Sequence, residues 1–495
     1  MTEQKFTPAG TSGLILNEKL LWEKGRKGRE AMSLVKSKAP KASLPAEIAG
    51  NGPDWPDLSE LEVVRHYTRL SSWNFGIDTG MYPLGSCTMK YNPVINECLA
   101  SLPGFANSHP LLPAEASQGT MRLIYELEKH LAEIVGLKEA SMQPAAGAHG
   151  ELCGMLMIAA YHRENEKSGA PRKTKVLMPD TSHGTNPATA SMCGFTEIKV
   201  PLGPKGYIEL EEIEKLMADD VAGLMITNPN TLGLFECNLA EIIALVHERG
   251  GLVYADGANL NAVMGYADLG RMGVDVVHYN LHKTMSTPHG GGGPGAGPVA
   301  VGDTLKPFLP GPRIVKKGDK YEWNADLPLS IGRLHGFHGQ FGVGVKAYSY
   351  ILSMGENLKK VSALAVLNAN YIKEKLKEAF DLPFDGPCMH ECVFTDAKQR
   401  DGKVTTLDIA KRLIDFGYHP PTVFFPLVVN SAIMIEPTET ESKEELDAFI
   451  EAMLEIAREA KENPEALREA PTRTKVRRMD ETTAARKPIL TGDMK

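Results

Sequence analysis

Short apolar runs alternate with amphipathic helices through the middle of this chain, and this alternation restricts its fold more than any other feature. The runs cover residues 175–178, 223–227, 252–255 and 274–279. Between the second and the third, apolar side chains recur at helical spacing from Leu239 to Val246, and Gly250 ends that helix. A repeat of strand, helix and strand predicts an α/β fold, with a mainly parallel sheet that carries helices on both faces.

Two charged residues stand where these runs end. Asp256 directly follows the run 252–255, and Lys283 follows the run 274–279. Ligands of parallel sheets bind beyond the carboxyl ends of the strands, so we expect both side chains at one edge of the sheet. The segment 290–297 comes next, and its many glycines indicate close backbone approach or a mobile lid over a substrate.

An acid, a lysine and a glycine-rich loop in this order are the parts that a pyridoxal phosphate (PLP) enzyme requires. A lysine binds the PLP aldehyde as a Schiff base, and a buried carboxylate keeps the ring nitrogen protonated so that the ring accepts electrons. We therefore predict covalent PLP at Lys283, with Asp256 at the ring nitrogen. Ala258 is small enough for the flat ring to lie against the backbone.

A small-residue turn precedes a helical run that begins near residue 151. Ala146, Gly147 and Ala148 permit close backbone approach, and the free amides at a helix N-terminus attract an anion. This turn is our candidate for the PLP phosphate, although many such turns have no ligand.

Other polar residues follow strand-like runs at the same predicted edge. We expect His183 to stack on the cofactor ring and Thr185 or Asn186 to bind a polar group; the alternative is a helix cap with a surface histidine. Asn228 either reaches the ring hydroxyl or is an ordinary turn residue. His282 either binds the phosphate or supports its loop.

Composition and charge indicate an ordinary globular protein. Hydrophobic residues make up 42% and charged residues 23%, and the net charge of -8 does not favour nucleic acid as a partner. The N-terminus has no apolar signal core, and no apolar run approaches the roughly 18 residues that span a bilayer. We therefore expect a cytoplasmic protein that makes no membrane contact.

The cysteines argue against both disulfides and a metal. Seven are scattered along the chain, and an odd, dispersed set does not form a disulfide framework. Cys388 and Cys392 flank a histidine and a glutamate, but their spacing is not C-x-x-C and no second ligand pair follows. No metal is predicted.

Changes in pattern divide the chain into four parts. We expect residues 1–115 to form an irregular arm that wraps a partner subunit or the next domain, and the basic stretch 24–29 to be a solvated surface or a subunit contact. Residues 116–345 form the large PLP-binding domain. Residues 346–460 form a smaller α+β domain, with a long helical region near 345–377 and a helix that a capping box opens at Ser442. Residues 461–495 are expected to be a polar tail, extended on the surface or on another subunit.

Several segments together resemble the glycine decarboxylase, or P-protein, family of the glycine cleavage system. They are residues 82–90, 182–188, 256–259, 280–284, 288–297 and 435–439, and the likeness extends from about residue 65 to beyond 455. The resemblance implies a fold type I PLP enzyme, aspartate aminotransferase-like, with a seven-stranded sheet in the large domain. It also implies Lys283 as the PLP lysine, with Asp256, His183 and the turn 146–148 around the cofactor.

The family reaction joins the amino group of glycine to PLP and releases CO2, and the aminomethyl group then passes to the lipoyl group of the H-protein. The chain matches only the second, catalytic half of the longer family members, so the resemblance implies a separate subunit 1, with two copies of each subunit. Ser86, Cys87 and Thr88 are the candidate wall of a glycine pocket, and Cys87 is not expected to be a nucleophile because the reacting sulfur arrives on the lipoyl arm. Arg313 and Arg333 either bind the glycine carboxylate or form structural ion pairs.

Two other functions compete with this one. A different PLP reaction on the same fold, such as cysteine desulfuration or amino-acid decarboxylation, would proceed without a lipoyl protein. A non-catalytic stabilising subunit would carry no PLP, and the presence of both Asp256 and Lys283 counts against it.

Overall fold

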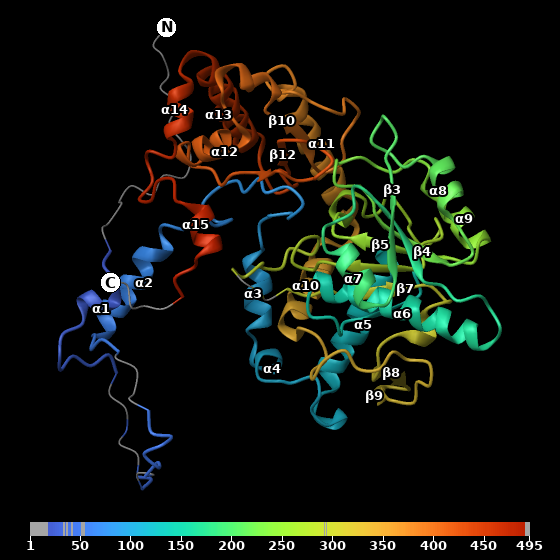
Figure 1. Cartoon of the computed structure of the whole chain (residues 1–495). Helices are drawn as coiled ribbons and strands as arrows, with labels where there is room; N and C mark the ends of the chain where they lie inside the picture. Colours follow the sequence, from blue (N-terminus) through green and yellow to red (C-terminus); the bar gives the residue numbers. More distant parts are fainter. Residues whose placement is uncertain are drawn as a thin grey trace.

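The computed structural model describes residues 18–32, 35, 38–40, 43–50, 55–291, 293 and 295–490. Figure 1 shows a large body around a central sheet, a smaller body built from the C-terminal third of the chain, and an arm that stands away from both. No helix among the described residues combines the length and the apolar character needed to cross a bilayer.

The large body contains a seven-stranded sheet. Its strands, in spatial order, are β1 (Glu139–Ser141), β7 (Val299–Val301), β6 (Val276–Tyr279), β5 (Leu252–Gly257), β4 (Val221–Thr227), β2 (Lys175–Pro179) and β3 (Thr196–Val200). The strands from β3 to β6 are parallel, whereas β7 is antiparallel to both β6 and β1. The predicted α/β class and mainly parallel sheet are confirmed. The apolar runs did not indicate β1, β3 or β7; β1 and β7 have only three residues each, too few to show a period.

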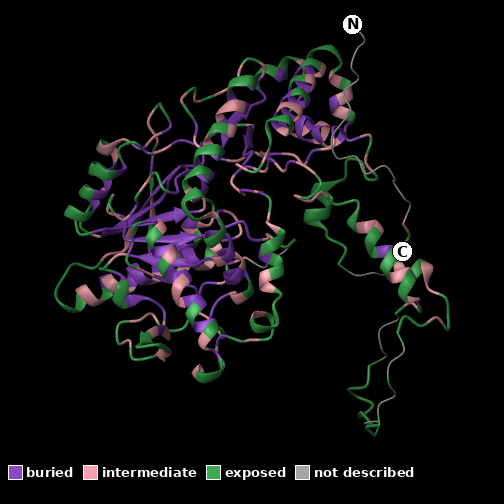
Figure 2. Ribbon diagram, turned by 180° about the vertical axis from the view of Figure 1, so that it is seen from behind, coloured by how far each residue is buried: buried purple, intermediate pink, exposed green. Residues whose placement is uncertain are grey.

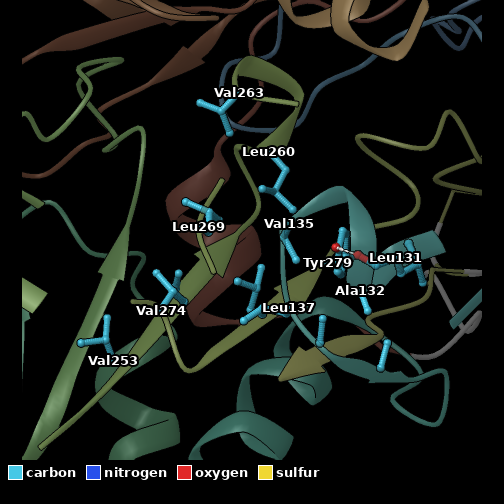
Figure 3. Packing of buried hydrophobic residues seen from close by; sticks show 14 of the residues in the cluster. Leu131, Ala132, Val135, Leu137, Val253, Leu260, Val263, Leu269, Val274 and Tyr279 are labelled. Atoms are coloured by element: carbon cyan, nitrogen blue, oxygen red, sulfur yellow. Dashed lines mark hydrogen bonds between the residues drawn. The ribbon is translucent and has the colours of Figure 1, made fainter. Parts of the chain in front are cut away.

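Helices pack on both faces of this sheet. They are α5 (Gln118–Ile134), α6 (Gly147–Lys167), α7 (Asn186–Met192), α8 (Leu210–Leu216), α9 (Leu239–Glu248) and α10 (Phe341–Met354). Figure 3 shows the core in which Leu131 of α5 and Val135, the residue that follows this helix, lie close to Tyr279 of β6. The hydroxyl of Tyr279 donates a hydrogen bond to the carbonyl of Leu131, so the end of β6, from which the chain continues to Lys283, is anchored to α5.

The smaller body is an α+β unit. A three-stranded antiparallel sheet, in the order β10 (Cys392–Thr395), β12 (Ala432–Ile435) and β11 (Thr422–Val423), packs with α11 (Leu358–Leu376), α12 (Thr406–Asp415), α13 (Lys443–Glu462) and α14 (Pro464–Glu469). The oxygen of Ser442 accepts from the amide of Glu445 at the start of α13. A separate two-stranded sheet pairs β8 (Arg313–Lys317) with β9 (Lys320–Asn324).

The structure differs from the sequence expectations in two places in the C-terminal half. The helical region near 345–377 is two helices, because Gly355 adopts a φ of 48° between α10 and α11. The segment from 461 onward is not simply extended, since it contains α14 and α15 (Glu481–Arg486). Leu467 and Ala470 are buried there, and these apolar side chains fix the segment to the smaller body.

The N-terminal segment contains helices, contrary to the expected irregular arm. They are α1 (Leu21–Lys24), α2 (Glu60–Ser71), α3 (Val94–Ala100) and α4 (Pro103–Ala106). A capping box between Ser59 and Glu62 begins α2, a local signal that the turn-rich composition obscured. Figure 2 shows that α1, α2 and the chain around them are largely exposed.

Candidate active site

Asp256 lies at the carboxyl end of β5, where the sheet register aligns it with His278 of β6. The carboxylate is 4% exposed; its Oδ1 accepts from the amide of Ala258 at 2.9 Å and lies 3.5 Å from Nε2 of His278. Nδ1 of His278 in turn lies 2.5 Å from the hydroxyl of Tyr254. Burial lowers the pKa of His278, so this imidazole is neutral at pH 7 and orients Asp256 without neutralising it.

Lys283 lies just beyond the neighbouring strand and points toward a segment from the N-terminal part of the chain. Its Nζ donates to the carbonyl oxygen of Ser86 at 2.7 Å. Burial lowers the pKa values of His183 and His278; the charge of Asp256 raises both values and the charge of Lys283 lowers them further. The four groups therefore share one electrostatic environment. The structure thus brings the predicted lysine and acid to the same edge of the sheet.

The small-residue turn lies at the same edge and begins α6. Ala146 is extended and precedes Gly147, the first residue of the helix. A Cβ on Gly147 would lie 2.0 Å from Oδ1 of Asn280, and one on Gly297 would lie 1.9 Å from the carbonyl oxygen of Ala146. Because no side chain fits between Gly297 and Ala146, the glycine-rich loop packs directly on the turn, and Ala146 and Ala148 stay exposed beside the free amides of α6.

His183 and Thr185 lie in the loop between β2 and α7. Oγ1 of Thr185 is 2.9 Å from Nδ1 of His183 and donates to Oε2 of Glu151 at 2.9 Å. Glu151 lies in the first turns of α6 and is 2% exposed. Burial, reinforced by the charge of Asp256, raises the pKa of Glu151 to about 7. A carboxyl group that titrates near neutrality therefore supports the loop that carries His183.

His282 packs against the glycine-rich loop. Its ring centroid lies 5.2 Å from that of His289, and burial first, then the charges of His289 and Lys283, lowers the pKa of His282 to about 3. The ring is therefore neutral at physiological pH and does not supply a positive charge to a phosphate. Gly292 and Pro294 of this loop lie outside the described residues.

Several buried polar atoms at this edge have no hydrogen-bond partner among the described residues. They are Oε1 of Glu151, Oγ of Ser182, Oγ1 of Thr227, Nδ2 of Asn228, Nδ1 of His282 and Oγ1 of Thr284. Buried polar atoms are ordinarily paired, so a concentration of unpaired ones marks a place for a polar ligand. These donors and acceptors fit a phosphorylated aromatic cofactor held between the turn at α6 and Lys283.

The segment that contains Ser86, Cys87 and Thr88 crosses from the arm to this edge. Glu391 of the smaller body accepts from the amide of Ser86 at 2.7 Å, and Glu436 accepts from the amide of Thr88 at 2.8 Å. Burial raises the pKa of the Cys87 thiol to about 11. The thiol therefore stays protonated at neutral pH, in keeping with the expectation that Cys87 is not a nucleophile.

The other candidates have different surroundings. Oδ1 of Asn228 accepts from the amide of Glu236 at 3.0 Å, which leaves only Nδ2 for a ligand. Arg313 forms an ion pair with Glu139, the first residue of β1. Arg333 is exposed. The ion pair of Arg313 favours the structural alternative over carboxylate binding, whereas the exposed position of Arg333 favours neither.

Sequence reasoning missed four buried groups beside the site: Glu151, His278, Glu391 and Glu436. Glu151 and His278 had a local signal. Glu151 follows the small-residue turn by one helical turn, and His278 is the next-to-last residue of β6, the strand beside that of Asp256. Glu391 and Glu436 come from the smaller body, and only the tertiary fold brings them to Ser86 and Thr88.

Two segments of the chain match known protein families. Residues 30–331 match the family described as glycine cleavage system P-protein, and residues 361–476 match the one described as glycine dehydrogenase, C-terminal domain. The chain is 55% identical over 478 residues to a probable glycine dehydrogenase (decarboxylating) subunit 2 of Caldanaerobacter subterraneus subsp. tengcongensis, covering 95% of this chain and 98% of that one. It is 54% identical over 477 residues to the protein of the same name in Alkaliphilus oremlandii, covering 95% and 98%.

Solved structures share the fold at lower identity. A glycine decarboxylase (P-protein) of the glycine cleavage system, in inhibitor-bound form, superposes with a TM-score of 0.70 at 21% identity, covering 83% of this chain and 93% of that one. A cysteine desulfurase from Escherichia coli superposes with a TM-score of 0.59 at 16% identity, covering 77% and 95%. These likenesses confirm the predicted fold type I architecture.

Proposed function

The chain belongs to the P-protein family of the glycine cleavage system, and on that premise we propose that it is the PLP-binding subunit that decarboxylates glycine and passes the aminomethyl group to a lipoylated H-protein. The reaction is that of glycine dehydrogenase (decarboxylating). The observation that carries the proposal is the meeting of Asp256, Lys283 and the α6 N-terminus at one edge of the sheet.

The residues at this edge have separate roles in the proposal. PLP, when bound, supplies an electron sink for the electrons that decarboxylation leaves behind. Lys283 would hold the cofactor covalently, and Asp256 would keep a proton on its ring nitrogen. The amides after Ala146 would bind the phosphate, and His183 would cover one face of the ring.

Glycine specificity is assigned to the segment around Ser86 and Thr88. Their backbone is held close to Lys283, so a side chain on the substrate α-carbon would meet this wall. Glycine has no such side chain. The neutral Cys87 thiol contributes shape and leaves sulfur chemistry to the lipoyl arm.

A second subunit is part of the proposal, with two copies of each chain. The similar proteins of the two bacteria are named subunit 2, which implies a subunit 1. The arm provides a suitable contact surface, because Trp55, Leu61, Val64 and Tyr67 are between 54% and 68% exposed. Exposed apolar groups of this size on one segment are typical of an interface.

A cytoplasmic location completes the proposal. All seven cysteines are free thiols, and none of the described residues forms a disulfide. Free thiols fit a reducing compartment.

The test is reconstitution with subunit 1, PLP and lipoylated H-protein, followed by glycine-dependent exchange of labelled CO2. Lys283→Ala is expected to abolish both the exchange and the borohydride-trapped PLP peptide. Lys306→Ala is the matched control, since Lys306 forms a surface ion pair with Glu139. Exchange retained by Lys283→Ala, or product formed without H-protein, would refute the proposal.

A further inference from the structure

We propose that Glu391 and Glu436 of the smaller body are positioning residues for Lys283: they hold the backbone of residues 86–88 so that the Ser86 carbonyl receives the lysine amine. The inference rests on the proposed function only in taking Lys283 as the reactive amine. It assigns a chemical task to two acids that lie outside the cofactor-binding edge of the sheet.

The two carboxyl groups are bound directly to the segment. Oε2 of Glu391 accepts from the amide of Ser86 at 2.7 Å. The two oxygens of Glu436 accept from the amide of Thr88 at 2.8 Å and from its hydroxyl at 2.5 Å. Both glutamates are 0% exposed, so water does not compete for these hydrogen bonds. Ser86 thus donates from its amide to Glu391 and accepts at its carbonyl from Lys283.

The backbone of this segment needs such support. Ser86 has a φ of 63° and Thr88 a φ of 48°, a left-handed conformation that residues with a Cβ rarely adopt. Strained residues of this kind persist when their surroundings determine them from several sides, and they concentrate at functional sites. Gly85, directly before Ser86, packs against Met434 of the smaller body. It has no room for a side chain, because a Cβ would lie 2.2 Å from Cγ of Met434.

The segment is also bound to the large body, so it connects the two. Nζ of the buried Lys90 donates to Glu439 of the smaller body and to Asn261 of the large body, each at 2.8 Å. Oγ of Ser286, three residues after the lysine, donates to the carbonyl of Tyr91 at 2.8 Å. A shift of the smaller body would therefore reach Lys283 through residues 86–91.

Burial and mutual charge favour a protonated form of the pair. Burial raises the pKa of Glu436 to about 7 and, together with the charge of Glu436, raises that of Glu391 well above its usual value. The titratable groups that face the pair are Lys283, Glu439, His390 and the thiols of Cys87, Cys388 and Cys392. Two adjacent buried carboxyls do not both ionise at neutral pH, and a carboxyl in either state still accepts from an amide.

A metal ion is the competing use of this cluster. One ligand atom each from His390, Glu391 and Glu436 lies within 4.8 Å of the others. The glutamate oxygens nearest Nε2 of His390, at 3.9 and 4.0 Å, are the ones that already accept from Ser86 and Thr88. These two oxygens already hold the backbone, whereas Oε1 of Glu391 and both ring nitrogens of His390 have no hydrogen-bond partner among the described residues, so metal binding is the alternative that the test must exclude.

The test compares Glu391→Leu with Glu391→Gln in the full chain, with PLP and subunit 1. The glutamine keeps a carbonyl oxygen that accepts from Ser86, whereas the leucine removes it. We expect Glu391→Leu to lower kcat by about 100-fold, as misplacement of a reacting group does, to slow borohydride trapping at Lys283, and to speed deuterium exchange of the amides of Ser86 and Thr88. Glu391→Gln is expected to keep kcat, the rate of trapping and the rate of deuterium exchange close to those of the wild type.

Asp415→Leu is the matched control for a purely structural loss. Asp415 is a buried acid of the same body that accepts from the amides of Thr472 and Arg473. The Asp415→Leu substitution should reduce the stability of the chain and leave borohydride trapping at Lys283 unchanged. If Glu391→Leu behaves like this control, or if the purified wild-type chain holds one equivalent of metal that Glu391→Gln loses, the inference is wrong.

The same measurements separate this inference from the proposed function. Trapping and deuterium exchange need no glycine and no H-protein. Absence of glycine decarboxylation in the wild type, with trapping that depends on Glu391, would overturn the function and leave the positioning role intact.

Discussion

Asp256 shows how the surroundings of one residue fix its position. Its carboxylate is 4% exposed, receives a hydrogen bond from Ala258, and has the neutral ring of His278 beside it. On the sheet it lies between β4 and β6, aligned with Thr227 and His278. A buried carboxylate of this kind is matched by a positive partner, and the proposed ring nitrogen supplies one.

Asp256→Asn is therefore expected to keep the fold and lose most of the activity. The amide has the same shape but no charge to hold a proton on the cofactor, and the loss is expected to be about 100-fold or more in kcat. Steady-state CO2 exchange measures it. Asp268→Asn, at an exposed turn, is the control; a comparable loss there, or near-normal activity of Asp256→Asn, would contradict the assigned role.

Cys87 gives a second test at this scale. Its thiol pKa is raised to about 11 by burial, so below that pH it remains a thiol and reacts slowly with alkylating agents. At pH 8 we expect iodoacetamide to label the exposed Cys98 and Cys237 well before Cys87, as peptide mapping would show. Cys87→Ser is expected to retain most of the activity, and a complete loss would restore the nucleophile hypothesis.

At the scale of elements, the start of α6 depends on close backbone contact with the glycine-rich loop. The carbonyl oxygen of Ala146 lies 1.9 Å from the place of a Cβ on Gly297. The amide of Gly297 also donates to the carbonyl of Pro144 at 3.1 Å. The helix N-terminus therefore keeps its direction only while residue 297 has no side chain.

Gly297→Ala is expected to displace this turn and weaken PLP binding by roughly tenfold or more, since one phosphate hydrogen bond to an ionised group contributes about 1.5–3 kcal/mol. Titration of the apoprotein with PLP, followed by absorbance, measures the change. Gly302→Ala is the matched control, because the nearest atom to its added Cβ is 3.8 Å away. Equal affinities of the two variants would contradict the phosphate assignment.

The contact of α5 with the end of β1 predicts a dependence of stability on pH. Glu128 of α5 accepts from the amide of Met142 at 2.9 Å, and burial raises the pKa of Glu128 to about 7 from its model-compound value of 4.5. Between these values the folded chain keeps a proton that the unfolded chain releases. Its contribution to stability is therefore lost as the pH rises from about 5 through 7.

Glu128→Gln removes that titration. Relative to wild type, the variant should gain on the order of a few kcal/mol in free energy of unfolding between pH 5 and pH 8. Thermal unfolding at both pH values measures the gain. Glu133→Gln, an exposed position on the same helix, should show no such trend, and a parallel response of the two variants would refute the assignment.

At the scale of the whole molecule, the arm is the part that the two bodies leave unpacked (Figure 2). Trp55 is 68% exposed, and its ring stacks on that of Trp22 with centroids 6.2 Å apart. Trp55→Lys is expected to weaken assembly with subunit 1 by at least tenfold in Kd, because a charge enters an apolar contact. Sedimentation of mixtures measures it, with Leu367→Lys, 61% exposed on α11, as the control; equal assembly of both would exclude the arm from the interface.

Local pattern was sufficient for the α/β class, the PLP-type motif and the family. The alternation of apolar runs with helices predicts a parallel sheet, and a parallel sheet places the residue after each strand at one edge. The sequence pattern alone therefore predicts that Asp256 and Lys283 lie at the same edge. The roles of the individual site residues stay predictions. The sequence pattern does not predict helix α2, the helix break at Gly355 or the burial of Leu467, because turn-rich composition and neighbouring polar residues obscure these features.

Tertiary structure alone decided what surrounds the reactive amine. Ser86 meets Lys283 on one side and Glu391 on the other, although these three residues are far apart in the sequence. The pKa values of Glu151 and Glu436 likewise depend on burial and on neighbours that no local window contains. Periodicity reports which face of an element is buried, whereas the identity of the partner across that face depends on the packing of the whole chain.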